Sequence, residues 1–420
     1  MKKRMMLGVA GVMLAGNALA AEELPIMAWG WPFELAQQEF TAERLLELRD
    51  AGFNHVLQWA PDAKVALQVL DLAQKMHVKV LLHYHENLNP SEAQINAVKD
   101  HPALYAYYVT DEPTPAKCAE IGPAVTRIQK LDPGHFAYIN SLGLCECDGQ
   151  KDGYGVPDGD FKKYLASFFA NFDWKVMRFD MYPVFTAQPC ENNDFRRPKG
   201  PIHIWDKWFP TLEIFRDESQ KRGIPFWAFV CCRAIRNHPK YDNPLPTVGH
   251  MKVQAYGNLA YGAQGLEYYT YRLRDNVTYN FAPLDRNFKR TPVYDRVRTV
   301  NRELQARAKC FVGSKSVRVR HIGNAIPNTC VKFDAEKDLP SWATELTTDR
   351  DALVAVLEKG GRQILVVVNV DMNDELTLKA SFSPGVKRVL TDGTTVDPAQ
   401  CCGQFWLNSG DAEIFVGPKE

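Results

Sequence analysis

A unit made of a β-rich run, a loop and a helical pattern recurs along most of this sequence and limits its fold more than any other feature. The chain repeats the unit eight times between Leu24 and about Ala308. Each β-rich run is apolar and aromatic through most of its length, as a strand buried on both faces should be. Eight strands that alternate with helices predict a (β/α)8 TIM barrel of the α/β class. The expected strands are 25–31, 55–59, 78–85, 104–110, 135–140, 175–182, 224–231 and 265–271.

Amphipathic stretches lie between these runs. The stretch 41–51 ends before Gly52, which is a common helix stop, and Asn89-Pro90-Ser91-Glu92 has the composition of a helix start. Further helices are expected at 63–76, 115–131, 204–221 and 247–261. A doubly wound sheet is the competing fold class, but no Gly-x-Gly-x-x-Gly turn follows the first strand.

The pattern changes after Cys310, where helical stretches give way to short strands. Gly360-Gly361 predicts a tight hairpin between two of them. The sequence therefore predicts a barrel over 21–309 and a small all-β sandwich domain over 310–420. The expected strands of the sandwich are 317–321, 352–358, 363–370, 376–381, 386–390 and 412–416.

The first twenty residues have the form of a cleavable signal peptide. Lys2, Lys3 and Arg4 precede a stretch of apolar residues that is too short to span a bilayer, and Ala18-Leu19-Ala20 follows with the small-x-small pattern of a cleavage site. We expect cleavage after Ala20 and a periplasmic or secreted protein. No later segment offers about eighteen uninterrupted apolar residues, so no membrane span is expected.

The charge and cysteine content restrict the classes of partner. The chain has 50 basic and 50 acidic residues, and a formal net charge of zero gives no electrostatic reason to bind nucleic acid. A neutral polymer fits better, and nine tryptophans suit a protein that stacks flat apolar ring faces. Ten cysteines fit an oxidising compartment. The run Cys145-Glu146-Cys147-Asp148 has no matching Cys/His pair at zinc-site spacing, so no metal or other cofactor is expected.

Catalytic groups of a TIM barrel lie at the carboxyl ends of its strands and in the loops that follow. The strand ends of this chain bring aromatic residues, histidines and a few carboxylates to one rim. Aromatic rings there suit the faces of sugar rings, and polar side chains suit their hydroxyl groups. The expected substrate-binding residues are Trp29, Trp31, Trp59, His83, His85, Tyr182, Tyr269 and Tyr271.

Glu112 is the first candidate for a catalytic residue. Hydrolysis of a glycoside needs a carboxylic acid that protonates the leaving oxygen and a carboxylate that serves as nucleophile or base. Glu112 follows Tyr105, Tyr107 and Tyr108, and an aromatic surrounding raises the pKa of a carboxyl group toward neutrality. The alternative role for Glu112 is that of a helix N-terminal carboxylate ahead of Pro113.

Four segments carry a resemblance to a known group of enzymes. The run Tyr107-Tyr108-Val109-Thr110-Asp111-Glu112-Pro113 resembles the fourth-strand signature of clan A glycoside hydrolases, whose acid/base is the Glu. Asp180-Met181-Tyr182-Pro183 looks like the sixth-strand end of related barrels. The segments 256–266 and 283–304 are similar to the last helices of family 42-type barrels. The resemblance covers about residues 25–310 and implies hydrolysis of glycosidic bonds, with a carbohydrate substrate and a role in polysaccharide degradation.

The sequence departs from this pattern at the second carboxylate. Clan A enzymes have their nucleophilic Glu at the end of strand seven, where this chain reads Phe229-Val230-Cys231-Cys232-Arg233. Asp180 is the favoured replacement because it ends a strand on the rim, and Asp111 is expected to orient Glu112 or to bind a sugar hydroxyl. If Asp180 is the base, the two carboxyl groups should be about 6.5–9.5 Å apart and the reaction should invert the anomeric centre; about 5–5.5 Å would predict retention. Glu267 is expected to form a buried pair with an arginine.

Two alternatives remain open. A barrel that has lost its nucleophile can serve as a non-catalytic carbohydrate-binding protein. His83 and His85 form a His-x-His pair at a strand end, which suits zinc in metal-dependent hydrolases, although sugar hydroxyls are the favoured partners here. Trp205 and Trp208 are expected to pack within the helix layer.

Overall fold

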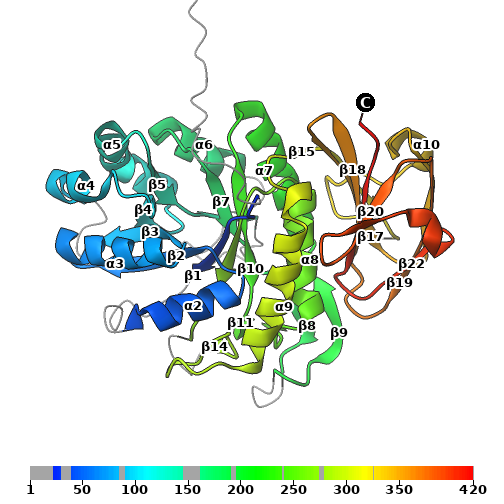
Figure 1. Ribbon diagram of the computed structural model, residues 1–420, viewed down its shortest axis with the longest axis horizontal. Coiled ribbons are helices and arrows are strands. Elements are labelled where there is room, and N and C mark those ends of the chain that lie inside the picture. Colours follow the sequence, from blue (N-terminus) through cyan, green and yellow to red (C-terminus); the bar gives the residue numbers. More distant parts are fainter. Residues whose placement is uncertain are drawn as a thin grey trace, which may run out of the picture.

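The structure is a computed structural model that describes residues 22–29, 39–84, 90–144, 161–190, 195–238, 241–273, 279–324 and 326–419. Figure 1 shows a ring of strands wrapped by helices, with a second, all-β part beside it. The expected signal peptide lies outside the described residues, and so do Trp31, His85, Cys145 and Cys147.

The parallel sheet has the order β5-β4-β3-β2-β1-β13-β10-β7-β6. β5 and β6 follow each other directly in the chain, so they are two halves of the fifth barrel strand, interrupted at Asn140. The ring therefore closes with eight strands, and the predicted TIM barrel is confirmed. Its strands are β1 (Ile26–Trp29), β2 (His55–Ala60), β3 (Lys79–Tyr84), β4 (Leu104–Thr110), β5 (Phe136–Ile139), β6 (Ser141–Leu142), β7 (Met177–Asp180), β10 (Phe226–Cys231) and β13 (Leu266–Tyr269).

The helices cover the outside of the barrel with their apolar faces turned inward. Side-chain caps define several starts, such as the capping box of Ser91 and Gln94 before α4, which confirms the predicted helix start. The helices are α2 (Ala42–Asp50), α3 (Ala63–Lys75), α4 (Glu92–Val98), α5 (Pro115–Leu131), α6 (Phe161–Asn171), α7 (Trp208–Arg222), α8 (Val248–Ala260) and α9 (Pro292–Ala306).

The predicted helix over 204–221 begins too early, because residues Lys199–Ile204 form the strand β9. Helix α7 starts at Trp208, which is buried against α8. A Cβ at Gly257 would lie 2.4 Å from the Trp208 ring, so only glycine allows this close contact. The predicted packing role of Trp208 is confirmed.

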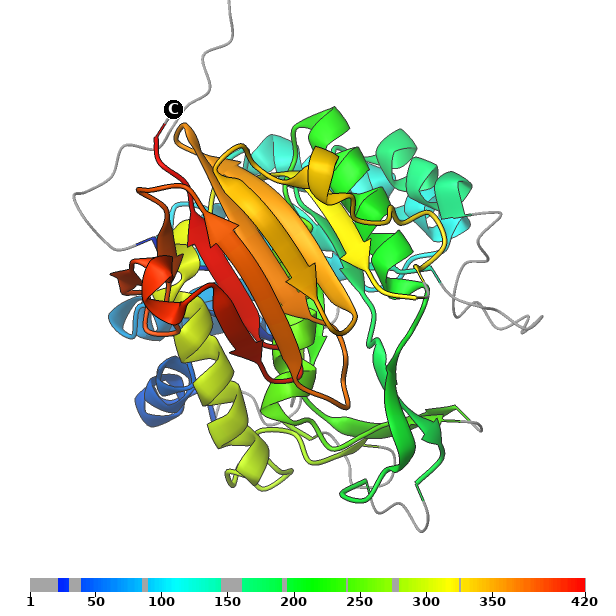
Figure 2. The same ribbon diagram turned by 90° about the vertical axis from the view of Figure 1, so that its right-hand side faces the viewer.

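Short antiparallel strands extend the carboxyl end of the barrel, and the sequence patterns did not predict them. They follow β7, β10 and β13 in the chain, and Figure 2 shows them at the lower edge of the molecule. They are β8 (Val184–Gln188), β9, β11 (Ala234–His238), β12 (Tyr241–Asn243) and β14 (Tyr279–Asn280).

The C-terminal part is a sandwich of a six-stranded and a three-stranded antiparallel sheet, as predicted. One face of the larger sheet packs on the barrel helices and the other packs on the smaller sheet. The larger sheet contains β15 (Lys315–Ile322), β17 (Ala352–Lys359), β18 (Arg362–Asn369), β23 (Ala412–Val416), β20 (Lys387–Val389) and β21 (Thr395–Val396). The smaller one contains β16 (Ala343–Thr348), β19 (Leu376–Phe382) and β22 (Gln404–Leu407), and single turns form α10 (Ala335–Asp338), η3 (Ala308–Cys310) and η4 (Pro398–Cys401).

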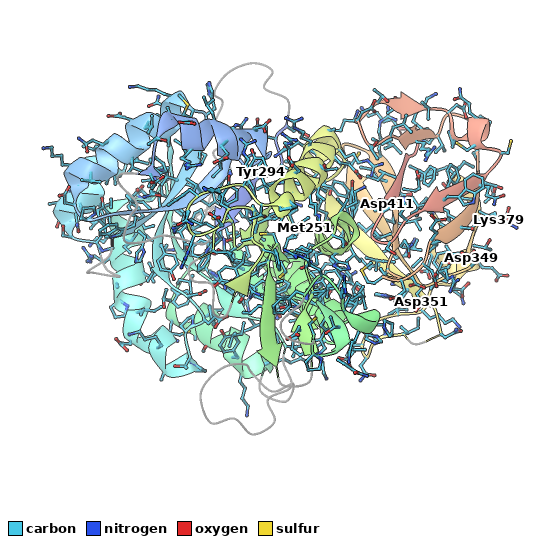
Figure 3. The ribbon with its side chains drawn as sticks, turned by 90° about the horizontal axis from the view of Figure 1, so that it is seen from below. Met251, Tyr294, Asp349, Asp351, Lys379 and Asp411 are labelled. Atoms are coloured by element: carbon cyan, nitrogen blue, oxygen red, sulfur yellow. The ribbon has the colours of Figure 1, made fainter. Side chains whose placement is uncertain are left out.

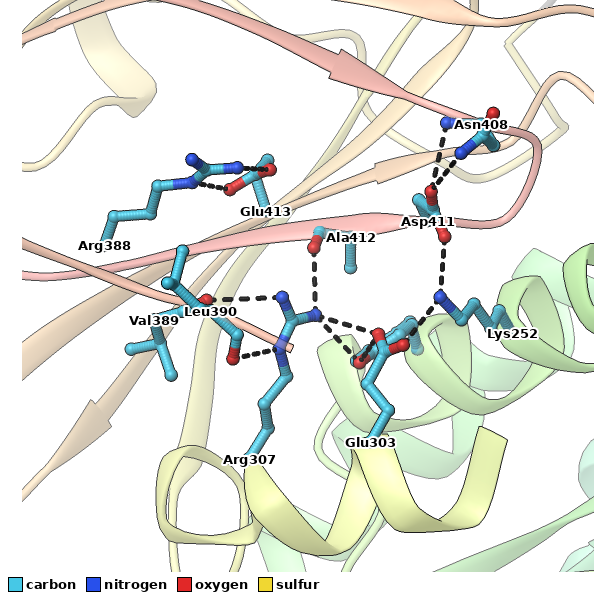
Figure 4. A network of polar contacts seen from close by, with 11 residues as sticks. Lys252, Glu303, Arg307, Arg388, Val389, Leu390, Asn408, Asp411, Ala412 and Glu413 are labelled. Atoms are coloured by element: carbon cyan, nitrogen blue, oxygen red, sulfur yellow. Dashed lines mark hydrogen bonds and ion pairs between the residues drawn. The ribbon is translucent and has the colours of Figure 1, made fainter. Parts of the chain in front are cut away.

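A buried polar network joins the barrel to the sandwich (Figure 4). Lys252 of α8 bonds Glu303 of α9 at 2.7 Å and Asp411 of the sandwich at 2.8 Å. Arg307 donates to the carbonyl oxygens of Leu390 and Ala412, both at 3.0 Å. Because these charges are buried and paired across the boundary, they fix the position of the sandwich on the barrel.

An ion pair occupies the centre of the barrel. Arg178 and Glu267 are fully buried, with Arg178 Nε 2.7 Å from Glu267 Oε1. Tyr138 donates to the other carboxylate oxygen at 2.6 Å, and Arg178 donates to Tyr105 at 2.8 Å. The predicted pairing of Glu267 with an arginine is confirmed.

Within the described part of the chain, no helix is long and apolar enough to cross a membrane.

The cysteines named below, all in the described part of the chain, form no disulfide bonds. Cys118, Cys231, Cys232 and Cys310 are buried free thiols, and Cys330, Cys401 and Cys402 are also free. Neighbouring Cys401 and Cys402 do not bridge each other.

The central ion pair leads to a test of stability. Glu267→Ala leaves Arg178 buried without its counter-charge, so the variant should lose about 3–5 kcal/mol of unfolding free energy. Arg178→Met/Glu267→Leu removes both charges and should lose less than the single variant. Urea unfolding of the three proteins measures this, with Glu120→Gln at an exposed ion pair as a control that should change by less than about 0.5 kcal/mol. A double variant that is as unstable as Glu267→Ala would contradict the account.

Candidate active site

Three carboxyl groups meet at the carboxyl end of the barrel, and we call Asp111, Glu112 and Asp180 the carboxylate cluster. Asp111 and Glu112 directly follow β4, and Asp180 is the last residue of β7. Asn140, in the break between β5 and β6, lies between them and is buried. Glu112 and Asp180 are half-buried, whereas Asp111 is exposed. The structure thus brings together the three residues that the sequence predicted as catalytic candidates.

The Asn140 side chain bridges two members of the cluster. Its Nδ2 donates one hydrogen bond to Asp111 Oδ1 at 2.9 Å and another to Asp180 Oδ1 at 3.0 Å. An amide nitrogen carries two hydrogens, so both are used. The Asn140 backbone takes part as well, because its carbonyl oxygen accepts from the Glu112 N–H at 3.1 Å. One residue therefore orients the carboxyl groups of Asp111 and Asp180 and holds the backbone of Glu112.

The backbone of Glu112 adopts a conformation that is unusual for its residue type. Its φ is 45°, in the left-handed region that glycine favours. Such a conformation costs free energy and persists only where the surroundings impose it, which occurs most often at functional sites. Here it turns the chain out of β4 and places the Glu112 carboxyl group beside Asp180.

The cluster holds a proton at neutral pH. Burial raises the pKa of Glu112 to about 10, and the negative charges of Asp180 and Asp111 and a hydrogen bond with Asp180 add to the effect. Burial also raises the pKa of Asp180, but hydrogen bonds from Glu112, Asn140 and Tyr182 oppose the shift and favour its ionised form. The hydrogen bond between the two groups adds to the rise in the pKa of Glu112 and opposes the rise in that of Asp180, so Glu112 holds the shared proton and Asp180 accepts from it.

Asp111 differs from the other two because water reaches it. The protein that surrounds its carboxyl group still removes enough solvent to raise its pKa to about 7, and the charge of Asp180 adds to the shift. Asn140 opposes the shift by donating a hydrogen bond. Asp111 is accordingly the member of the cluster that titrates in the physiological range.

The predicted separation of about 6.5–9.5 Å between Glu112 and Asp180 is wrong for this structure. The two carboxyl groups are in hydrogen-bond contact, because one proton between them relieves the repulsion that two buried carboxylates would suffer. A direct contact is also shorter than the gap of retaining enzymes, so the separation does not indicate the stereochemistry.

Aromatic rings surround the cluster on the inner side of the barrel. The ring of Tyr108 stacks on that of Tyr138 with 5.7 Å between the ring centres, and its centre is 4.6 Å from that of the His83 ring. Tyr182 stacks on Tyr269 with 5.7 Å between the ring centres. Trp29 joins the two groups through Tyr108 and Tyr269, and Trp59 packs against the same interior cluster. Trp29, Trp59, His83, Tyr182 and Tyr269, all expected to bind substrate, therefore share the interior of the barrel.

Tyr271 lies elsewhere. It is buried in the layer between the strands and the helices, where its ring centre is 5.2 Å from that of Phe53. Strand β13 ends at Tyr269, whose side chain lies inside the barrel. Tyr271 follows after the end of the strand, and its side chain lies in the outer layer instead.

The end of the seventh barrel strand shows what replaces the Glu of clan A enzymes. Cys231 is buried beside Tyr182 and its thiol donates to the Arg233 carbonyl oxygen at 3.4 Å, whereas Cys232 lies in the outer core. Burial raises the pKa of the Cys231 thiol, so it is protonated and a weak nucleophile. Arg233 lies 4.9 Å from the ring centres of both Tyr182 and Tyr269.

Sequence reasoning missed Asn140 as a residue of the site, and it named Tyr108 only as part of the aromatic surrounding of Glu112. Asn140 ended a predicted strand on the rim, so its position was visible, but its contacts depend on the break in the fifth strand.

Among the described residues, no group of three or more His, Cys, Asp and Glu side chains is placed to hold a metal ion.

Comparison with known protein families finds no match, and no curated protein sequence matches either. The structure is similar to that of a GH42 β-galactosidase from G. stearothermophilus, with a TM-score of 0.58 and 9% identity over 94% of this chain and 98% of that one. It is also similar to a cold-adapted β-galactosidase from Rahnella sp. R3, with a TM-score of 0.53 and the same identity and coverage. Identities this low show the fold alone, which is a TIM barrel with a C-terminal β part.

The shared proton gives the unfolding free energy a specific pH dependence. The pKa of Glu112 is higher in the folded state than its ordinary value of 4.5, so the folded protein binds the extra proton. Its stabilising effect is complete below pH 4.5 and is lost as the pH rises toward the raised pKa. Glu112→Gln keeps a neutral side chain at every pH, so its stability relative to wild type should increase from pH 5 to pH 8, by about 1.4 kcal/mol per pH unit or about 4 kcal/mol in all. Denaturant unfolding at both pH values measures the difference; equal changes in the two proteins would show that Glu112 ionises normally.

Proposed function

We propose that this protein is a glycoside hydrolase that cleaves O-glycosidic bonds of an oligo- or polysaccharide. The observation that supports the proposal is a glutamate with a raised pKa that donates a hydrogen bond to an aspartate at the carboxyl end of a TIM barrel. This is the pair that glycoside hydrolysis needs, one acid and one carboxylate with pKa values driven apart by their surroundings.

Glu112 is the general acid of the proposed reaction. The glycosidic oxygen of the substrate takes the place of Asp180 as the acceptor of the Glu112 proton. As the proton moves to that oxygen, the bond between the oxygen and the anomeric carbon breaks and its electron pair stays on the departing sugar. The raised pKa of Glu112 keeps the proton in place at neutral pH until the substrate arrives.

Asp180 is the second carboxylate. Once Glu112 has turned to the substrate, Asp180 takes a proton from the water that attacks the anomeric carbon, or attacks that carbon itself. Its hydrogen bonds from Asn140 and Tyr182 keep it ionised and fixed in either role. Asp111 is exposed and already bonded to Asn140, which suits it to bind a substrate hydroxyl beside the reacting bond.

Glu112→Gln and Asp180→Asn test these roles with two kinds of substrate. Glu112→Gln should lower kcat on natural glycosides by about 10²–10⁴-fold, because the leaving oxygen is no longer protonated. It should lower kcat much less on a dinitrophenyl glycoside, whose leaving group departs without a proton. Asp180→Asn should lower kcat on both substrates by a similar factor.

Steady-state kinetics of the purified variants checks the pattern, with Glu120→Gln on the outer helix α5 as the control that keeps full activity. Equal losses on both substrates in Glu112→Gln would remove Glu112 as the acid.

The alternative function, a non-catalytic carbohydrate-binding protein, is favoured by the protonated Cys231 at the seventh strand end. Binding of glycans without any release of reducing sugar would support it.

The proposed place of action is outside the cytoplasm. Expression in a bacterium and mass spectrometry of the protein recovered from the periplasm or medium should find a chain that begins at Ala21. A protein that stays in the cytoplasm with residues 1–20 attached would contradict the expected signal peptide.

A further inference from the structure

A cavity of about 580 Å³ lies between the barrel and the sandwich. None of the residues of the carboxylate cluster lines it. Sites for small molecules occur preferentially at such domain boundaries, and this volume is within their usual range. The barrel contributes residues 202–206 and Phe209, and the sandwich contributes His321, Ile322, residues 326–328, Asp351 and residues 370–373.

The walls of the cavity are held in place by contacts that do not involve a ligand. Ile202 and Asn373 exchange two hydrogen bonds across the domain boundary, at 2.9 and 3.0 Å. The backbone N–H of Asn324 donates to the Asp351 carboxylate. Asp371 Oδ1 accepts from the backbone N–H groups of Asn373 at 2.9 Å and Asp374 at 3.2 Å. A site that is ordered in advance loses less free energy when it binds.

The lining is rich in hydrogen-bond acceptors. Asp206, Asp351 and Asp371 contribute carboxylates, and Asn328 contributes an amide that both donates and accepts. No Lys or Arg is among the described residues that line the cavity. Arg350 lies outside the lining, and its guanidinium group is 4.0 Å from the Asp371 carboxylate. The charge of Asp371 adds to the rise that burial causes in the pKa of Asp351.

This chemistry selects a class of ligand. Carboxylates accept hydrogen bonds from hydroxyl and ammonium groups but repel phosphates and carboxylates. The half-buried Trp205 adds a flat apolar ring to the same wall, which suits the apolar face of a sugar. Figure 3 labels Asp351 on the sandwich close to the boundary with the barrel.

We infer that this cavity is a second saccharide site, separate from the carboxylate cluster, which binds neutral and amino sugars and excludes anionic ones. It rests on the proposed function for its ligand class only, because no bond is cleaved there. A sugar unit bound at the boundary would anchor a longer glycan to the enzyme.

Calorimetric titration of the full mature protein with glucose, glucosamine and glucuronic acid tests the inference. Asn328→Trp fills the cavity from its exposed edge and should weaken the binding of glucose and glucosamine by at least about tenfold. Asp351→Asn keeps the shape and removes one charge, so it should weaken glucosamine by about tenfold, the effect of one charge-assisted hydrogen bond, and glucose less. Asp349→Asn is the matched control, since Asp349 lies two residues away in the chain, outside the lining, and should change neither affinity.

Each outcome decides something. Binding of glucose and glucosamine that Asn328→Trp weakens, with no binding of glucuronic acid, supports the inference. No binding of either sugar, binding that Asn328→Trp leaves unchanged, or glucuronic acid that binds as tightly as glucosamine would overturn it. Hydrolysis assays on the same proteins separate the two proposals: a wild-type protein that binds through the cavity but releases no sugar refutes the proposed function alone.

Discussion

The two hydrogens of one amide group hold the candidate active site together. Asn140 lies where the fifth barrel strand breaks, and its Nδ2 reaches Asp111 on one side and Asp180 on the other. Without these donors, three carboxyl groups at the end of an apolar barrel would repel each other and would bind protons instead of keeping their charge. With them, the pKa of Asp180 is raised less than burial alone would raise it, while burial and the charges of its neighbours raise the pKa of Glu112. The pair of protonation states on which the proposed chemistry depends therefore follows from a single side chain and from the break that positions it.

The rest of the barrel supports this arrangement. Arg178 and Glu267 neutralise each other below the cluster, so this pair adds no net charge to the site. The left-handed backbone of Glu112 turns its carboxyl group toward Asp180, which an ordinary strand end would not do. The polar network of Lys252, Glu303 and Arg307 fixes the sandwich to the outside of the barrel. The boundary that this network stabilises also forms the cavity of the second proposed site.

The sequence predicted the barrel well because strands buried on both faces must be apolar throughout, and that signal is strong at each of the eight positions. Helix α5 was predicted at its observed bounds since Thr114 caps it and Pro115 begins it. The hairpin β8–β9 was missed because its strands are short and partly exposed, and 199–204 carries no clear alternation. Contacts across the site were beyond the sequence. Asp180 was predicted as the partner of Glu112 from its strand end, but their direct hydrogen bond depends on the backbone of Glu112 and on Asn140. Tyr271 looked equivalent to Tyr269, and only the path of the chain after β13 separates them.

The central claim is that Glu112 carries a proton at neutral pH. Carbon NMR of protein labelled at the glutamate side-chain carboxyl carbons, recorded over a pH titration, measures this directly. The account predicts a resonance that titrates far above the ordinary glutamate pKa of about 4.3 and that is absent from Glu112→Gln, whereas raised resonances of buried glutamates such as Glu267 remain. If every glutamate titrates near that ordinary value, or if Glu112→Gln removes none of the raised resonances, the account is contradicted.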